Sequence, residues 1–209
     1  MKNILRIKLL LALLLMALVP CVNAQVAHVG DILCTNGVYL NPAEYSSSGL
    51  EAMGVIFYVD ATGQHGWIVA LQNAGSLSWG PNSSIQTPLP DYNNVRAAIY
   101  DMDGLFNTQE VLNFGTSHNY TYSAFEALDV DNGWYVPAIG QLNYLYGNII
   151  EVNTGLAACG GIQFDMAGSW TCWSSTEHDG SNAWCLVSNG KLNSITKSGI
   201  YYVRGVHNF

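Results

Sequence analysis

The densest group of chemistry-bearing side chains in this sequence is Glu177-His178-Asp179. Carboxylates suit Ca²⁺ and imidazole suits Zn²⁺, so a cluster of this kind is a candidate for holding a metal ion or a ligand. Adjacent residues on a short loop rarely converge on one ion unaided, and a solvated turn is the simpler interpretation. Binding sites favour loops held on a rigid sheet. We therefore predict ligand contacts from these three residues and the nearby Asn182, and no metal site.

A second candidate loop covers residues 72–93, which are rich in Asn, Ser, Pro and Gly. This composition is typical of an irregular surface loop. Trp79 and Asn82 lie in its middle and offer an aromatic face and an amide. The two residues are predicted to contact a ligand through stacking and hydrogen bonds.

Other acidic and histidine residues give no catalytic pattern. Asp101-Met102-Asp103-Gly104 and Asp129-Val130-Asp131-Asn132-Gly133 do not fit the spacing of an EF-hand, and are interpreted as turns and helix caps. Calcium stays open as the one alternative to an absence of cofactors. The five histidines are scattered, and the sequence contains no G-x-S-x-G, H-E-x-x-H or P-loop motif. No catalytic residue is predicted.

The first 24 residues are typical of a secretory signal peptide. Lys2, Arg6 and Lys8 precede an unbroken apolar run of 11 residues, Leu9 to Val19, and Val22-Asn23-Ala24 offers a cleavage site. The run is short of the ~20 apolar residues that a spanning helix needs. We expect export to the periplasm, the cell surface or the medium, with no transmembrane segment in the mature chain.

Charge narrows the range of partners. Beyond residue 24 the sequence keeps four of its 7 basic residues and all 15 acidic ones, a net charge of 4 − 15 = −11. A basic footprint for nucleic acid is absent. The polar surface is instead expected to be rich in amides and hydroxyls, since 17 Asn, 16 Ser and 21 Gly follow residue 24. This composition favours neutral ligands.

The elements that position these residues are strands, then helices, then strands. Asn36-Gly37 and residues 61–66 turn two hairpins, and four cysteines follow the signal peptide. Helices are predicted over about 93–100, 109–113, 139–146 and 149–158, and later strands over 170–175, 183–187 and 201–203. This order predicts an α+β fold with a mainly antiparallel sheet, in a single domain over 25–209 with a strand-rich N-terminal extension to about 90.

The four cysteines are predicted to form two disulfides, as expected of an exported chain. A hairpin register that places Cys172 opposite Cys185 also places Trp173 opposite Trp184, which favours a Cys172–Cys185 bridge and leaves Cys34 and Cys159 as the other pair. The other connectivities stay open. Trp173 and Trp184 are interpreted as structural residues of the sheet, with sugar stacking as the alternative.

An ordered series of motifs resembles the bacterial Lcl C-terminal domain family and its exported relatives. The series is Gly133-Trp134-Tyr135-Val136-Pro137, Gln141-Leu142, Trp173-Ser174-Ser175-Thr176-Glu177, Ala183-Trp184, Ser188-Asn189-Gly190 and Tyr201-Tyr202-Val203-Arg204. The stretches Gly30–Leu33 and Gly54–Asp60 resemble an N-terminal extension found in exported members. The resemblance covers about residues 30–209.

This resemblance implies a C-type-lectin-like fold in which Trp134, Pro137, Tyr202 and Arg204 have structural roles. It also implies a surface adhesin that binds sulfated polysaccharide, although a net charge of −11 opposes a polyanion. We predict a non-enzymatic binding module for a glycan or a surface protein. The alternatives are a hydrolase or oxidase on a lectin-like scaffold, and a structural subunit of a surface assembly.

Overall fold

The computed structural model describes residues 26–81 and 84–209. The predicted signal peptide and Asn82 lie outside these residues. The described helices are α2 (Pro42–Ser48), α3 (Val95–Ala98), α4 (Gly104–His118), α5 (Ser123–Glu126), α6 (Ile139–Gly147) and α7 (Ile149–Ala158), with a 3₁₀ turn at Val130–Asn132. The strands are β1 (Ile32–Cys34), β2 (Tyr39–Leu40), β3 (Ala52–Val59), β4 (Gly66–Ala70), β5 (Gly75–Ser78), β6 (Thr171–Glu177), β7 (Asn182–Val187), β8 (Leu192–Thr196), β9 (Ile200–Val203) and β10 (Val206–Asn208).

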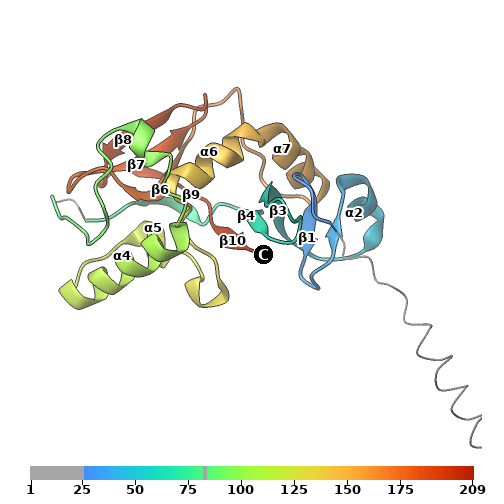
Figure 1. Ribbon diagram of the computed structural model, residues 1–209, viewed down its shortest axis with the longest axis horizontal. Helices are drawn as coiled ribbons and strands as arrows, with labels where there is room; N and C mark the ends of the chain where they lie inside the picture. The colour runs from blue at the N-terminus through green and yellow to red at the C-terminus, as the bar shows by residue number, and fades with distance from the viewer. Residues whose placement is uncertain (1–25, 82–83) are drawn as a thin grey trace, which may run out of the picture.

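These elements build two five-stranded sheets. The first has the order β10-β4-β3-β1-β2 and the second β5-β9-β6-β7-β8, and they form two lobes side by side (Figure 1). Every strand pair is antiparallel except β6 with β9. The predicted α+β, mainly antiparallel class is confirmed, and the arrangement is compatible with a lectin-like fold. In the part of the chain that the structure describes, no helix is long and apolar enough to cross a membrane.

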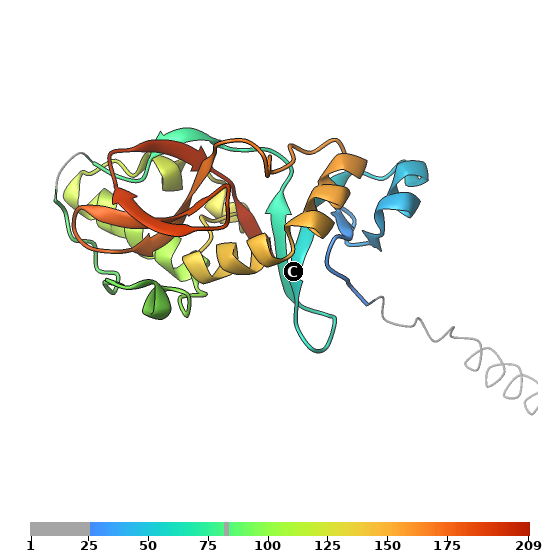
Figure 2. The same cartoon turned by 90° about the horizontal axis from the view of Figure 1, so that it is seen from above.

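Helix α6 packs on both lobes. Leu145 belongs to the core between the first sheet and α7, whereas Ile139 and Leu142 pack against Trp184 and Leu186 of the second sheet. Figure 2 shows α6 running from one lobe to the other and leading into α7. The second sheet buries its opposite face under α4 and α5, where Val111 and Phe125 contact Trp173 in one cluster. One helix thus joins two cores.

Arg204 lies at the seam, the boundary between the two lobes, and is 2% exposed. Its guanidinium donates to the carbonyls of Ala70, Leu71 and Ile162, at 2.7, 3.0 and 2.7 Å, and to Asn73 Oδ1 at 3.0 Å. Burial lowers the pKa of Arg204 to about 10. These bonds connect the crossing from β4 to β5 with the crossing from β9 to β10, so the structural role inferred for Arg204 fits its position.

Several predicted elements are confirmed. Asn36-Gly37 turns the β1–β2 hairpin, with Gly37 at φ 83°, and β3 and β4 form the second hairpin. Helices α6 and α7 lie where they are predicted. The helix predicted over 109–113 is longer, because Asp103 caps α4 through Phe106 N at 3.1 Å and starts it at Gly104. The strands β5, β8 and β10 and helix α2 were not predicted.

The predicted Cys172–Cys185 bridge is wrong. Register in the β6–β7 hairpin is shifted by one residue, so that Trp173 lies opposite Cys185 and Cys172 lies opposite Leu186. Alternation along a strand then directs the two cysteine side chains to opposite faces of the sheet. Cys172 and Cys185 are free thiols, as are Cys34 and Cys159, the pair expected to remain. The same shift separates Trp173 from Trp184.

Alkylation tests this register. Burial raises the pKa of Cys172 to about 11 and that of Cys185 to about 12, so both thiols should resist iodoacetamide in the native protein. Both should be alkylated in guanidinium chloride without any reductant. Recovery of a Cys172–Cys185 linked peptide from non-reducing peptide mapping would show that the register is wrong.

Candidate functional site

The Glu177-His178-Asp179 cluster does not form one site, because its side chains point in different directions. Glu177 is fully buried and forms an ion pair with Lys197, which is itself 2% exposed. The carboxylate also accepts from Thr87 Oγ1 at 2.5 Å and Thr87 N at 3.3 Å, and from Gln86 Nε2 at 3.2 Å. Glu177 is therefore a structural residue, and the prediction that it contacts a ligand is wrong.

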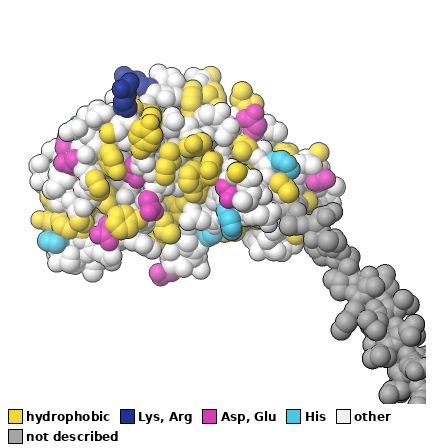
Figure 3. Space-filling model, viewed as in Figure 1, with side chains coloured by type: hydrophobic (Ala, Val, Ile, Leu, Met, Phe, Trp, Pro, Cys, Tyr) yellow, Lys and Arg dark blue, Asp and Glu magenta, His cyan; other side chains and the backbone are white. Residues whose placement is uncertain are grey.

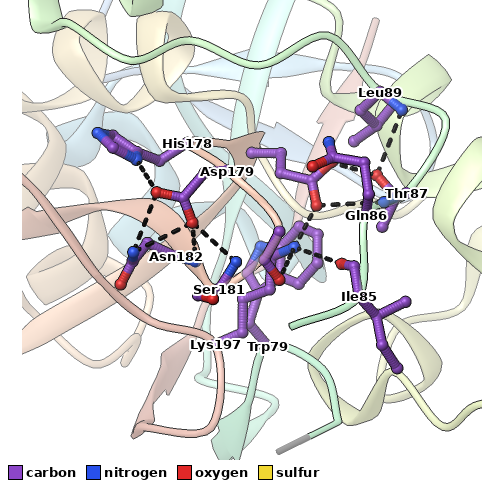
Figure 4. A network of polar contacts seen from close by, with 12 residues as sticks. Trp79, Ile85, Gln86, Thr87, Leu89, His178, Asp179, Ser181, Asn182 and Lys197 are labelled. Carbon is purple, nitrogen blue, oxygen red and sulfur yellow. Dashed lines mark hydrogen bonds and ion pairs between the residues drawn. The ribbon is translucent and has the colours of Figure 1, made fainter. Parts of the chain in front are cut away.

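Lys197 completes this buried network from the turn after β8. Its ammonium donates to the carbonyls of Ile85 and Gly180 at 3.0 and 3.1 Å, and lies 4.8 Å from the ring centroid of Trp79 (Figure 4). Burial lowers the pKa of Lys197 and raises the pKa of Glu177, and the hydrogen bond between the two side chains acts in the opposite direction on both. The pair fixes the long loop after β5 on the β6–β7 hairpin.

Trp79 is also buried in the protein, contrary to the prediction that it contacts a ligand. It is 0% exposed, and its indole packs edge-on against Tyr122 and Phe125, with centroids at 5.7 and 4.9 Å. Its Nε1 donates to Ser174 O at 2.8 Å. A large aromatic ring in a loop rich in Asn, Ser and Pro serves here as an anchor of that loop.

Two other tryptophans bind the chain before and within this loop. Trp173 Nε1 donates to Leu77 O of β5 at 2.9 Å, and Trp184 Nε1 donates to Tyr92 O of the loop at 2.7 Å. Both are buried, at 0% and 5% exposure. Among the other residues with predicted structural roles, Pro137 is buried and Trp134 partly buried, whereas Tyr202 is 42% exposed.

His178, Asp179 and Asn182 form a self-contained turn. Asp179 Oδ1 accepts from Ser181 N and Asn182 N at 2.7 and 2.8 Å, and Asp179 Oδ2 lies 2.7 Å from His178 Nδ1 (Figure 4). Burial acts to raise the pKa of Asp179, but hydrogen bonds from Asn182, Ser181 and His178 outweigh it and lower that pKa to about 2. The carboxylate is occupied by its own turn, so the turn offers a ligand little beyond the His178 ring.

The acidic turns have the structural role that was predicted. Asp103 and Asp129 cap α4 and the 3₁₀ turn, and the buried Asp101 accepts from Asn107 Nδ2 and Thr176 Oγ1 at 2.8 and 2.7 Å. Within residues 26–81 and 84–209, no group of three or more His, Cys, Asp and Glu side chains could hold a metal ion.

The best-formed concave site lies at the seam between the lobes, and we call it the seam pocket. Its volume is about 230 Å³. It is lined by Asn73, Ile162, Gln163, Phe164, Asp165, Ser169, Trp170, Cys172, Tyr202 and Arg204. Three aromatic rings and several amide, hydroxyl and carboxylate groups therefore surround one small space, which is the usual make-up of a ligand site.

Local hydrogen bonds preorganise the loop that forms most of this pocket. Phe164 exchanges two bonds of 2.8 Å with the Asn153 side chain of α7, and Trp170 Nε1 donates to Asp165 O at 2.8 Å. Asp165 Oδ1 accepts from the amides of Ala167 and Gly168 at 3.0 and 2.9 Å. The rings of Phe164 and Trp170 lie 5.3 Å apart. A ligand would meet walls that are already in place.

This pocket was not predicted from the sequence, which assigns Trp170 to a strand, Tyr202 and Arg204 to structural roles, and residues 160–169 to no element. The wall comes from three separate segments of the chain, which only the folded seam brings together. The dense aromatic content around 164–170 was the one signal available.

Surface charge adds a constraint on ligands. Of the four basic residues beyond residue 24, Lys197 and Arg204 are buried, whereas Arg96 and Lys191 are exposed. On the face drawn in Figure 3, Lys and Arg side chains gather at one corner, and hydrophobic side chains cross the middle. The seam pocket has one cation in its wall, and that cation is engaged by four oxygen atoms of the protein.

Removing one member of the buried Glu177–Lys197 ion pair should lower the free energy of unfolding. Lys197→Met leaves the Glu177 carboxylate buried without its cation, and loss of one partner of a buried pair costs about 3–5 kcal/mol. Urea denaturation should show this loss of unfolding free energy. The double variant Glu177→Met/Lys197→Met should recover much of it, because two apolar side chains leave no buried charge. A single variant within about 1 kcal/mol of wild type would contradict the role of the pair.

The Asp179 turn should make stability depend on acid pH. The folded pKa of about 2 lies below the unfolded value of roughly 3.9, so ionised Asp179 stabilises the fold above about pH 4. That contribution is lost as the pH falls from about 4 towards about 2. The gap in urea midpoint between wild type and Asp179→Ala should therefore be widest near pH ~5 and close near pH ~2. Glu44→Gln, which removes an exposed carboxylate on α2, is the control, and a gap independent of pH would refute the assignment.

The comparisons with known proteins give a likeness of fold. The chain is similar to a fimbrial protein from Bacteroides ovatus ATCC 8483 of known crystal structure, with a TM-score of 0.65 and 18% sequence identity. The match covers 87% of this chain and 49% of that protein, so this chain spans about half its length. No protein-family model matches the sequence. No curated protein matches it either.

Proposed function

We propose that this protein is an exported, non-enzymatic binding module that acts at the bacterial cell surface and holds a neutral saccharide in the seam pocket. The observation that carries the proposal is the pocket itself, a preformed space of about 230 Å³ with Phe164, Trp170 and Tyr202 around it. Aromatic faces pack against the apolar C–H faces of a sugar ring, and amides, hydroxyls and carboxylates bond its hydroxyl groups. Asn73, Gln163, Asp165 and Ser169 supply those groups here.

The ligand class follows from charge. Asp165 carries the carboxylate in the pocket wall, and the Arg204 guanidinium donates to four oxygen atoms of the protein. Sulfated polysaccharide, which the Lcl-type resemblance implied, would meet a chain of net charge −11 with two exposed basic residues. A neutral hexose or N-acetylhexosamine meets no such repulsion, and we favour it.

The surface location rests on two supports. The N-terminal segment has the pattern of a signal peptide, and the fold is similar to that of a fimbrial protein. A module of a surface assembly that presents a sugar pocket combines the adhesin and the assembly hypotheses. Enzymatic function has no support comparable to these, and we propose none.

Glycan-array binding followed by calorimetric titration tests this function. Tyr202→Ala removes an aromatic wall that is 42% exposed, and should weaken binding of the best neutral glycan roughly fivefold, since a ring contact is worth about 1 kcal/mol. Trp170→Ala should weaken it further. Tyr100→Ala, which truncates a tyrosine 77% exposed on another part of the surface, should bind as wild type does.

Two results would overturn the proposal. One is that no neutral glycan binds. The other is that binding persists unchanged in both Tyr202→Ala and Trp170→Ala. Binding of sulfated glycans that depends on Arg96 and Lys191 would replace the neutral ligand by an anionic one.

A further inference from the structure

A second hollow lies at the opposite end of β4 from the seam pocket, beside the turn that joins β3 to β4. Its volume is about 340 Å³. It is lined by Tyr58, Asp60, His65, Gly66, Trp67, Asn208 and Phe209. We call it the hairpin hollow. The seam pocket shares none of these residues, so substitutions in one site leave the lining of the other intact and the two sites can be tested independently.

Aromatic rings form the wall of the hairpin hollow. Tyr58 and Trp67 are cross-strand neighbours whose rings stack with centroids 4.3 Å apart. Tyr144 of α6 is not part of the lining, but it packs edge-on against both rings, at 5.0 and 6.1 Å. Phe209 is the third ring of the lining and is held 5.5 Å from Tyr39. Contacts between these rings fix them, and the faces of an aromatic ring attract cations.

A carboxylate lies at the rim of the hairpin hollow. Asp60 Oδ1 accepts from Thr62 N at 3.0 Å and from Thr62 Oγ1 at 2.6 Å, within the hairpin turn. The Thr62 side-chain bond lowers the pKa of Asp60, so the group is an anion at neutral pH. Asn208 Oδ1 accepts from Tyr135 OH at 2.5 Å, which orients that amide beside the hollow.

The charged side chains around the hairpin hollow favour a cation. The lining contains no Lys or Arg, and the exposed basic residues Arg96 and Lys191 belong to α3 and to the β7–β8 turn of the other lobe. The chain around it carries a net charge of −11 beyond residue 24. Aromatic faces next to an ionised carboxylate, in a negative field, are the chemistry that selects an organic ammonium group over a neutral or anionic one.

We propose that the hairpin hollow binds an organic ammonium group between the Tyr58–Trp67 stack and Asp60. An outer face of this stack contacts the carbon shell of the cation, and Asp60 balances its charge. A quaternary headgroup, a lysine side chain and an amino sugar all carry this chemistry. All three share the ammonium group and differ in the rest of the molecule, so one probe of each kind distinguishes them.

Titration followed by NMR on the exported chain, at constant ionic strength and neutral pH, tests the site. The probes are choline, Nα-acetyl-lysine methylamide and glucosamine, and the readout is the Trp67 indole N–H signal. The neutral isostere of choline, 3,3-dimethylbutan-1-ol, has the same shape without the charge. At least one ammonium probe should shift the Trp67 signal in a saturable way and bind at least fivefold more tightly than its neutral counterpart, which for glucosamine is N-acetylglucosamine.

Variants locate the binding. Asp60→Asn keeps the shape of the side chain and removes the charge, and should weaken the preferred probe at least fivefold. Glu44→Gln removes an exposed carboxylate on α2 and should leave binding unchanged, which separates a local carboxylate from the general field. Tyr58→Leu, checked for folding by its melting temperature, should also weaken binding. The proposal is overturned if no ammonium probe shifts the Trp67 signal, if the neutral isosteres bind equally well, or if Asp60→Asn and Glu44→Gln have the same effect.

Discussion

The buried pair of Glu177 and Lys197 is the interaction on which the second lobe depends. It is placed where β6 ends, and it draws in the turn after β8 and the loop after β5, which contribute Lys197, Gln86 and Thr87. Taking two charges out of water is expensive, and the interior recovers this cost only when both ions are fully hydrogen-bonded. The network meets that condition through two backbone carbonyls, one amide side chain and one threonine. The network thereby fixes the position of the loop after β5, whose Asn, Ser, Pro and Gly residues favour no regular structure.

The two lobes are held together by one helix, α6, and one residue, Arg204, each of which contacts both of them. Helix α6 contributes to both cores, and the Arg204 side chain ties its own segment to two others, at residues 70–73 and at Ile162. The seam pocket follows from this arrangement, because the segments that Arg204 holds together are those that form the pocket wall. The hairpin hollow depends instead on local packing within one lobe, where Tyr58 and Trp67 meet across two paired strands.

Local signals made much of the fold predictable. Asn36-Gly37 marks its hairpin through the positive φ that Gly37 adopts, and the apolar spacing of α6 and α7 places both helices. The strands at the sheet edges, β5 and β8, are short and have no strong alternation, so their sequences do not distinguish them from loops. The register of a strand pair is set by packing on both faces of the sheet. A shift of one residue gave Cys172 and Trp173 other cross-strand partners than those predicted.

The sites were harder to predict, because exposure is a property of the fold. Trp79 and Glu177 have the residue types of a binding loop, but their partners come from distant parts of the chain, as in the bonds from Trp79 to Ser174 and from Thr87 to Glu177. The residues that do line open hollows, Tyr58, Trp67, Trp170 and Tyr202, have the composition of ordinary strands. Their availability depends on which face the neighbouring helices leave uncovered.

The first sheet takes β1 to β4 from residues 32–70 and its last strand from residues 206–208, where β10 pairs with β4. The first lobe is thus completed by a strand that follows every strand of the second lobe in the sequence. Contacts of such long sequence separation slow folding. A polypeptide built this way cannot complete its first sheet until the whole second lobe has been synthesised.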